Sequence, residues 1–240
     1  MRLRALLIAL LTTVVSLIGI SSANAASYRL DQIGLPDGTS EVARWNPCQA
    51  SITYKVNVAK IHGERAKRSA VRVTKASVAR VKDATGMRFS YKGRTRMVPR
   101  SGNLSSQNTA EIVIAFVTPA QTNYPLKGSV AGYGGWQASY GKQDGSYVAA
   151  IARGFVVIDN PQTRSWPNGV RRRGLTRANI ISHELGHAVG LGHVDDPHQL
   201  MNPTLRTGAP VGFARGDRVG LRKVGRPAGC IDASWMVNDG

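Results

Sequence analysis

The chain has 240 residues, of which 42% are hydrophobic and only 2 are cysteines. This length is sufficient for one domain with a substantial core. The formal net charge of +18 is extreme, and such a surface attracts polyanions, which include anionic cell-envelope polymers and acidic substrates. No recognisable nucleic-acid-binding module accompanies the charge, which argues against a specific nucleic-acid partner.

The first 25 residues have the composition of a signal peptide. Arg2 and Arg4 form a short basic start, residues 3–20 are almost all apolar, and residues 23–25 (Ala-Asn-Ala) form a small-x-small cleavage site. We therefore expect cleavage after Ala25 and a secreted, extracellular protein, with an uncleaved membrane anchor as the alternative. No later segment is apolar enough to span a membrane, so we expect no membrane span after cleavage.

The polar residues 26–44 are interpreted as an N-terminal extension, and residues 45–240 as a single domain. The first elements predicted in this domain are a strand at 51–58, a helix at 64–84 and a short strand at 87–92. The helix is predicted because apolar residues recur at helical spacing, at Ala70, Val73, Val78 and Val81.

A polar loop at 94–108 precedes the strongest strand signal of the chain, residues 110–117. This strand is apolar enough to be buried on both faces. Two further strands are predicted at 129–136 and 147–158, separated by a loop rich in Gly, Ser and Asp at 139–146.

Two helices are predicted in the last third of the chain. Thr176 is a good N-cap for a helix that ends near Val189, and Asp217 begins a second helix that ends at Val224. The basic run at 171–173 precedes the first of these helices and is interpreted as a solvated loop rather than a specific anion site.

The most specific feature of the sequence is His-Glu-Leu-Gly-His-Ala-Val-Gly-Leu-Gly-His at residues 183–193. On a helix, His183 and His187 leave the same face one turn apart, so they can share one metal ion. His193 would lie about 240° around a continued helix from His187, so the helix must end before it. The two intervening glycines permit the left-handed backbone conformations that stop a helix and fold the chain back.

Three neutral imidazoles without a fourth protein ligand are typical of a catalytic zinc, whereas structural zinc sites are closed by four ligands. Glu184 follows the first histidine and is placed to act as a general base on water. The alternatives are a structural zinc, with Asp195 or His198 as a fourth ligand, and a surface helix that merely carries histidines.

This histidine string resembles the metzincin clan of zinc endopeptidases. Leu200-Met201-Asn202-Pro203 fits the methionine-containing turn that is the second signature of the clan, at a spacing from His193 similar to that of the matrixins. Val194 departs from the residues that usually follow the third histidine. The resemblance implies that Met201 shapes the floor of the metal site without binding zinc.

The resemblance also implies an α+β fold. We expect a twisted, mostly parallel sheet with an antiparallel edge strand, an active-site helix and a small C-terminal subdomain. In that fold the segment 129–136 would be the edge strand that pairs with substrate backbone. The pocket for a substrate side chain would lie between the active-site helix and residues 203–213.

The two cysteines most simply form one disulfide, Cys48–Cys230, that clamps the ends of the domain in an oxidising compartment. The alternative is that Cys48 is an inhibitory thiolate on the zinc, as in matrixin pro-segments. Asp144, Asp159 and nearby carbonyls could hold a calcium ion.

These features predict a secreted, monomeric zinc endopeptidase that acts on a protein or peptide substrate. His183, His187 and His193 would hold one catalytic Zn²⁺, and Glu184 would be the general base. Two alternatives stay open: a basic, envelope-associated zinc-binding protein that cuts no peptide bond, and a zinc amidase that acts on cell-wall peptide.

Overall fold

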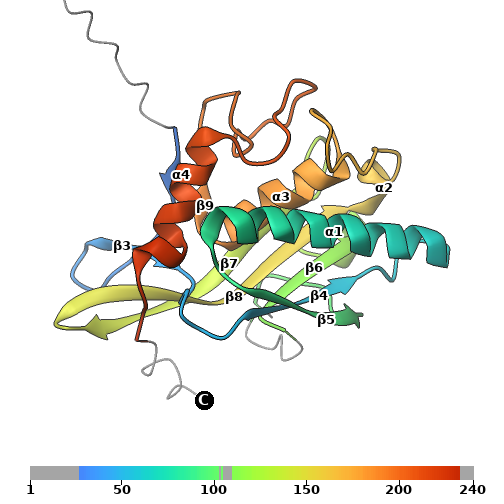
Figure 1. Ribbon diagram of the computed structural model, residues 1–240. Coiled ribbons are helices and arrows are strands. Elements are labelled where there is room, and N and C mark those ends of the chain that lie inside the picture. Colours follow the sequence, from blue (N-terminus) through green and yellow to red (C-terminus); the bar gives the residue numbers. More distant parts are fainter. Residues whose placement is uncertain (1–26, 103, 105–109, 233–240) are drawn as a thin grey trace, which may run out of the picture.

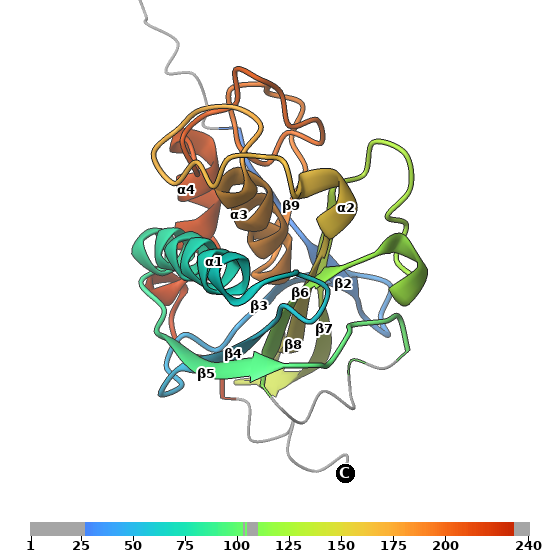
Figure 2. The ribbon, with the colours of Figure 1, turned by 90° about the vertical axis from the view of Figure 1, so that its right-hand side faces the viewer.

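The computed structural model describes residues 27–102, 104 and 110–232 (Figure 1). The predicted signal peptide lies outside these residues. The three longest helices lie together on one side of a twisted sheet (Figure 1 and Figure 2). Among the described residues, no helix combines the length and the apolar character needed to cross a lipid bilayer.

Four parallel strands form most of a seven-stranded sheet, in the order β8 (Ser146–Asp159), β6 (Ile112–Val117), β4 (Ile52–Asn57) and, at one edge, β5 (Phe89–Thr95). β7 (Gly132–Gln143) pairs antiparallel with β8 and forms the edge opposite β5. This arrangement confirms the α+β fold with a mostly parallel sheet and an antiparallel edge strand.

The N-terminal segment contributes three strands that the sequence analysis did not predict. β3 (Ser40–Arg44) pairs parallel with β8, and β2 (Gln32–Gly34) pairs antiparallel with β3. β1 (Arg29–Leu30) pairs antiparallel with β9 (Leu191–Gly192). These strands are short and polar, so they lack the apolar alternation that marks a strand in a sequence.

The core forms between this sheet and two helices, α1 (Glu64–Thr85) and α3 (Arg177–Ala188). All six side chains of β6 are buried, which confirms the prediction of a strand covered on both faces. The predicted inward residues of α1 are buried as well, namely Ala70, Val73, Val78 and Val81. The smaller elements are η1 (Pro119–Gln121), α2 (Asn160–Thr163), α4 (Arg215–Val224) and η2 (Arg226–Ala228).

The prediction of a loop at 139–146 was wrong, because β7 and β8 form one long hairpin. Only Asp144 and Gly145 separate the strands, with φ angles of 50° and 80°. Asp-Gly is a favoured pair for a two-residue hairpin turn with both φ angles positive. β5 likewise continues to Thr95, beyond the predicted end at residue 92.

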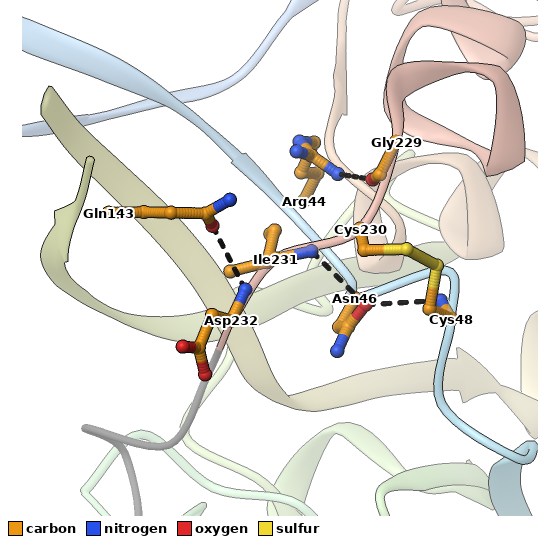
Figure 3. Close-up of a disulfide and its surroundings, with 8 residues drawn as sticks. All are labelled: Arg44, Asn46, Cys48, Gln143, Gly229, Cys230, Ile231 and Asp232. Carbon is orange, nitrogen blue, oxygen red and sulfur yellow. Dashed lines mark hydrogen bonds between the residues drawn. A yellow bond between two sulfur atoms is a disulfide. The ribbon is translucent and has the colours of Figure 1, made fainter.

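Cys48 and Cys230 form a disulfide whose Cα atoms are 5.3 Å apart (Figure 3). Asn46 reinforces this junction, since its Oδ1 accepts hydrogen bonds from the backbone N–H groups of Cys48 and Ile231. Arg44 donates a further hydrogen bond to the Gly229 carbonyl. Because the thiol of Cys48 is consumed in this bond, the inhibitory-thiolate alternative is wrong for this form of the chain.

Removal of the disulfide should destabilise the domain, because the bond spans 182 residues and restricts the unfolded chain. We expect the double variant Cys48→Ser, Cys230→Ser to lose about 2–5 kcal/mol of unfolding free energy in chemical denaturation. Wild type reduced with dithiothreitol is the matched control and should unfold at the midpoint of the variant. Equal midpoints for oxidised wild type and the variant would contradict this role.

Candidate metal centre and active site

The local sequence of α3 explains why the histidine helix stops where it does. Thr176 caps the start of α3 by accepting a hydrogen bond from the Asn179 N–H. At the other end, the indole N–H of Trp45 donates to the Ala188 carbonyl at 2.9 Å. Gly190 then adopts a φ of 101°, and a side chain there would meet the Ala43 carbonyl. The chain can therefore turn back at residue 190, as the sequence predicted.

This turn brings His183, His187 and His193 together. Their three Nε2 atoms are separated by 3.0, 3.1 and 3.3 Å. Two nitrogens bound to one tetrahedral zinc ion at about 2.05 Å each would lie about 3.3 Å apart. The spacing of these atoms therefore fits a single zinc ion. We call these three residues the metal cluster, since they are the group found among the described residues that could hold a metal ion.

Backbone carbonyls orient two of the imidazoles. His183 Nδ1 lies 2.7 Å from the Leu200 carbonyl oxygen, and His187 Nδ1 lies 2.7 Å from the Leu191 carbonyl oxygen. A carbonyl only accepts hydrogen bonds, so each Nδ1 carries the proton and each Nε2 offers a lone pair. Burial lowers the pKa of His183 to about 4 and that of His187 to about 3, which keeps both rings in the neutral form that binds metal.

Asp31 stands beside the third histidine, and the sequence analysis did not identify it. Its carboxylate interacts with the Trp136 side chain of β7 and electrostatically with His193. Burial lowers the pKa of His193, and the negative charge of Asp31 opposes part of that effect. A side chain at Gly192 would approach the Asp31 carboxylate to 2.8 Å. The N-terminal segment thus forms part of the wall around the metal cluster.

Glu184 is buried against β7. Burial raises the pKa of its carboxyl to about 8, and a hydrogen bond with the Gly134 backbone opposes part of this rise. A Cβ atom at Gly132 would lie 2.9 Å from the Glu184 Oε1, and one at Gly134 would collide with the Glu184 backbone carbonyl. The glycines of β7 therefore allow the edge strand and α3 to approach closely at the site.

Met201 is buried beneath α3, where a Cβ atom at Gly186 would lie 2.5 Å from its sulfur. Asp217 of α4 holds the turn that carries it. The Asp217 carboxylate accepts hydrogen bonds from the backbone N–H groups of Leu200, Met201 and Ala214 at 2.7, 3.2 and 2.8 Å. Since the Leu200 carbonyl orients His183, Asp217 acts on the metal cluster through this turn. The sequence showed Asp217 only as a helix-starting residue.

A cleft of about 690 Å³ contains Glu184 and the metal cluster. Its lining includes residues that the sequence predicted, namely Ile180 of α3 and the loop residues Pro203 to Leu205. Residues 129–134 line the opposite side, in and before β7. Leu175 and Trp166 also border the cleft, although no sequence pattern indicated them.

Several residues considered in the sequence analysis lie outside the cluster. Asp195 and His198 are exposed and do not join the three histidines in the part of the chain that the structure describes. Asp144 sits in the hairpin turn, while Asp159 caps α2 at the far end of the 14-residue strand β8. Because each strand residue adds about 3.3 Å, the length of β8 keeps these two carboxylates too far apart to bind one calcium ion. The basic run at 171–173 is exposed.

The fold and the three-histidine site together define a metzincin-type catalytic domain. A family model for the matrixins matches residues 44–224, and the chain therefore belongs to the matrixin family. Matrilysin of Homo sapiens is 36% identical over 61 residues, which cover 25% of this chain and 22% of matrilysin. The chain thus matches about a fifth of the length of that curated relative. Membership of the matrixins supports a zinc-dependent metalloprotease.

Replacement of Gly134 by alanine should disrupt the contact between β7 and α3. The new Cβ would overlap the Glu184 carbonyl oxygen, so one backbone must move. We expect a loss of about 1–3 kcal/mol in unfolding free energy, together with reduced peptide cleavage. Gly208→Ala is the matched control, because nothing lies within 4 Å of its added Cβ. Equal stability of the two variants would contradict the close approach.

Proposed function

We propose that the chain is a secreted zinc endopeptidase in which His183, His187 and His193 bind the metal and Glu184 moves the proton. The observation that carries this proposal is the convergence of three Nε2 lone pairs in the cleft that contains Glu184. No fourth metal-binding side chain joins them among the described residues, which favours a catalytic over a structural zinc.

When bound by the three histidines, zinc would polarise the scissile carbonyl and lower the pKa of a neighbouring water molecule toward about 7. The positive charge held there also opposes the effect of burial on Glu184 and favours its carboxylate form. Glu184 then accepts a proton from water as the carbonyl is attacked and returns it to the leaving amine. Its burial against β7 keeps the carboxylate in one position for both transfers.

The substrate backbone is expected to lie along β7. Within the part of the chain that the structure describes, this strand pairs only with β8, so its other edge could accept an extended peptide by strand addition. Gly132 and Gly134 border the cleft beside Glu184. An extended peptide on this edge would pass next to the metal cluster.

The cleft favours an apolar substrate side chain. Ile180, Leu205 and Trp166 line the part beside α3, and none of them carries a charge. Apolar walls bind apolar side chains best, because they offer few hydrogen-bond partners to polar groups. We propose that this region binds a substrate side chain. It corresponds to the pocket expected from the sequence between the active-site helix and residues 203–213.

Secretion rests on the signal-like composition of residues 1–25, and the Cys48–Cys230 disulfide is compatible with an oxidising compartment. Residues 26–44 supply β1 to β3 as well as Asp31, so we propose that the secreted domain needs this segment.

Two variants separate chemistry from metal binding. Glu184→Gln keeps the side-chain shape but removes the base, so zinc content should stay near one ion per chain while kcat/KM falls at least about 100-fold. His187→Ala removes a ligand and should lose zinc and activity together. The measurements are cleavage of a quenched fluorescent peptide and metal analysis of each purified variant.

Cleavage by zinc-loaded Glu184→Gln within a few-fold of wild type would show that the proposed mechanism is wrong. Full zinc loading without cleavage of any peptide or denatured protein by wild type would favour the zinc-binding alternative. Isolated cell-wall peptide, assayed in parallel, tests the amidase alternative.

A further inference from the structure

The positive charge of the chain is concentrated in one continuous segment. Residues 64–100 contain 12 lysines and arginines and 2 acidic residues, a net charge of +10 out of +18 for the whole chain. This segment forms α1 and β5. β5 is the sheet edge opposite β7, so this charge lies away from the edge strand that borders the cleft (Figure 2).

Five exposed basic side chains form a stripe along α1. They recur three, four or seven positions apart, which places them on one face of a helix, at Arg65, Arg68, Arg72, Lys75 and Lys82. From first to last the stripe is about 26 Å long at 1.5 Å per residue. None of these five residues forms an ion pair with a described residue. Their charges are therefore available to a partner.

An irregularity in β5 adds two more cations to the same side of the molecule. Tyr91 pairs with Tyr54 of β4, so a regular strand would place Gly93 opposite Val56. Instead, Arg94 pairs with Val56. β5 therefore has one extra residue here, and Gly93 adopts a φ of 93°. Such a bulge reverses the alternation of side chains, so Arg94 points to the same face as Tyr91.

Contacts between α1 and β5 join the two groups of cations. Lys75 Nζ lies 4.1 Å from the centre of the Tyr91 ring. Glu64 bridges the elements, because its carboxylate lies 3.0 Å from Lys67 Nζ and 3.0 Å from Arg94 Nη1. Arg96 follows two residues later and lines a crevice of about 520 Å³ with Lys67 and Arg94. We call the α1 stripe together with Arg94 and Arg96 the basic face.

The chemistry of the basic face favours phosphate groups. Five of the seven cations of the basic face are arginines, whose planar guanidinium pairs with phosphate through two hydrogen bonds. The first four positions of the stripe are about 5–6 Å apart, so a linear polymer can meet several of them with successive anionic groups. Among the described residues, no large hydrophobic side chain on α1 or β5 is exposed. The partly exposed ring of Tyr91 is already in contact with Lys75 and Tyr54, so the face offers no open platform on which bases could stack.

We propose that the basic face binds a flexible, linear, phosphate-bearing polymer other than nucleic acid. Because β5 and β7 are opposite edges of the sheet, the polymer can be bound while a peptide occupies the cleft. The interaction retains the enzyme on an anionic surface without contact with the metal cluster. This binding does not depend on peptide cleavage, so it is tested independently of the proposed activity.

The test uses inorganic polyphosphate as the probe and Glu184→Gln as the protein background. The variant Arg65→Gln, Arg68→Gln, Arg72→Gln removes three charges from the α1 stripe, and glutamine preserves helix propensity. Arg171→Gln, Arg172→Gln, Arg173→Gln is the matched control, because it removes the same charge from an exposed loop. We expect at least about tenfold weaker binding at about 150 mM salt for the stripe variant and under about threefold for the control.

The salt dependence provides a second readout. Loss of three phosphate contacts should reduce the slope of log affinity against log salt by about 2, whereas the control should retain the wild-type slope. Circular dichroism and the thermal midpoint should be unchanged in both variants, and polyphosphate should leave small-peptide cleavage by wild type unaffected. Equal weakening by both variants, no binding of polyphosphate by the parent protein, or tighter binding of single-stranded or duplex DNA than of polyphosphate would overturn the proposal.

Discussion

Three imidazoles must direct their Nε2 lone pairs to one point, and two of them lie on a helix that cannot carry the third. The chain satisfies this requirement by ending α3 at Ala188 and turning at Gly190, where the left-handed backbone is free of side-chain strain. The rings of His183 and His187 are then oriented by hydrogen bonds from Nδ1 to the carbonyls of Leu200 and Leu191. Each of these carbonyls belongs to a segment that must itself be held in place.

The surrounding structure supplies that support from distant parts of the chain. β1 pairs with β9 and steadies the segment that follows the turn, while Trp45 satisfies the last carbonyl of α3. Asp217 binds the turn that carries Leu200 and Met201, so α4 is coupled to the metal cluster. On the other side, the glycines of β7 let the edge strand meet α3 beside Glu184. The same contact thus places both the edge strand proposed to bind substrate and Glu184, the group proposed to transfer the proton.

The elements that the sequence predicted well are those with a strong local pattern. β6 is a continuous apolar run, and α1 has an apolar stripe at helical spacing. The histidine string itself contains the glycines that allow its helix to end. The predicted bounds of these elements agree with the structure to within about two residues. Local patterns could not show the strands in residues 29–44, because their stability comes from pairing with β8 and β9 rather than from their own composition.

The same reason explains which site residues were missed. Asp31 reaches His193 across more than 150 positions of sequence, and Asp217 acts on His183 only through the backbone of Leu200. The bulge at Gly93, which turns Arg94 toward α1, is visible only when β5 is paired with β4. Each of these features depends on a partner that is remote in the sequence, so no spacing rule identifies it.

The coordination of the metal tests the account most directly, and X-ray absorption spectroscopy of the zinc-loaded protein measures it. The geometry of His183, His187 and His193 predicts three imidazole nitrogens at about 2.0–2.1 Å, with the remaining position open to solvent and exchangeable for a small chelating inhibitor. A shell of four protein ligands, or one that contains sulfur, would contradict the assignment of this cleft as a catalytic zinc site.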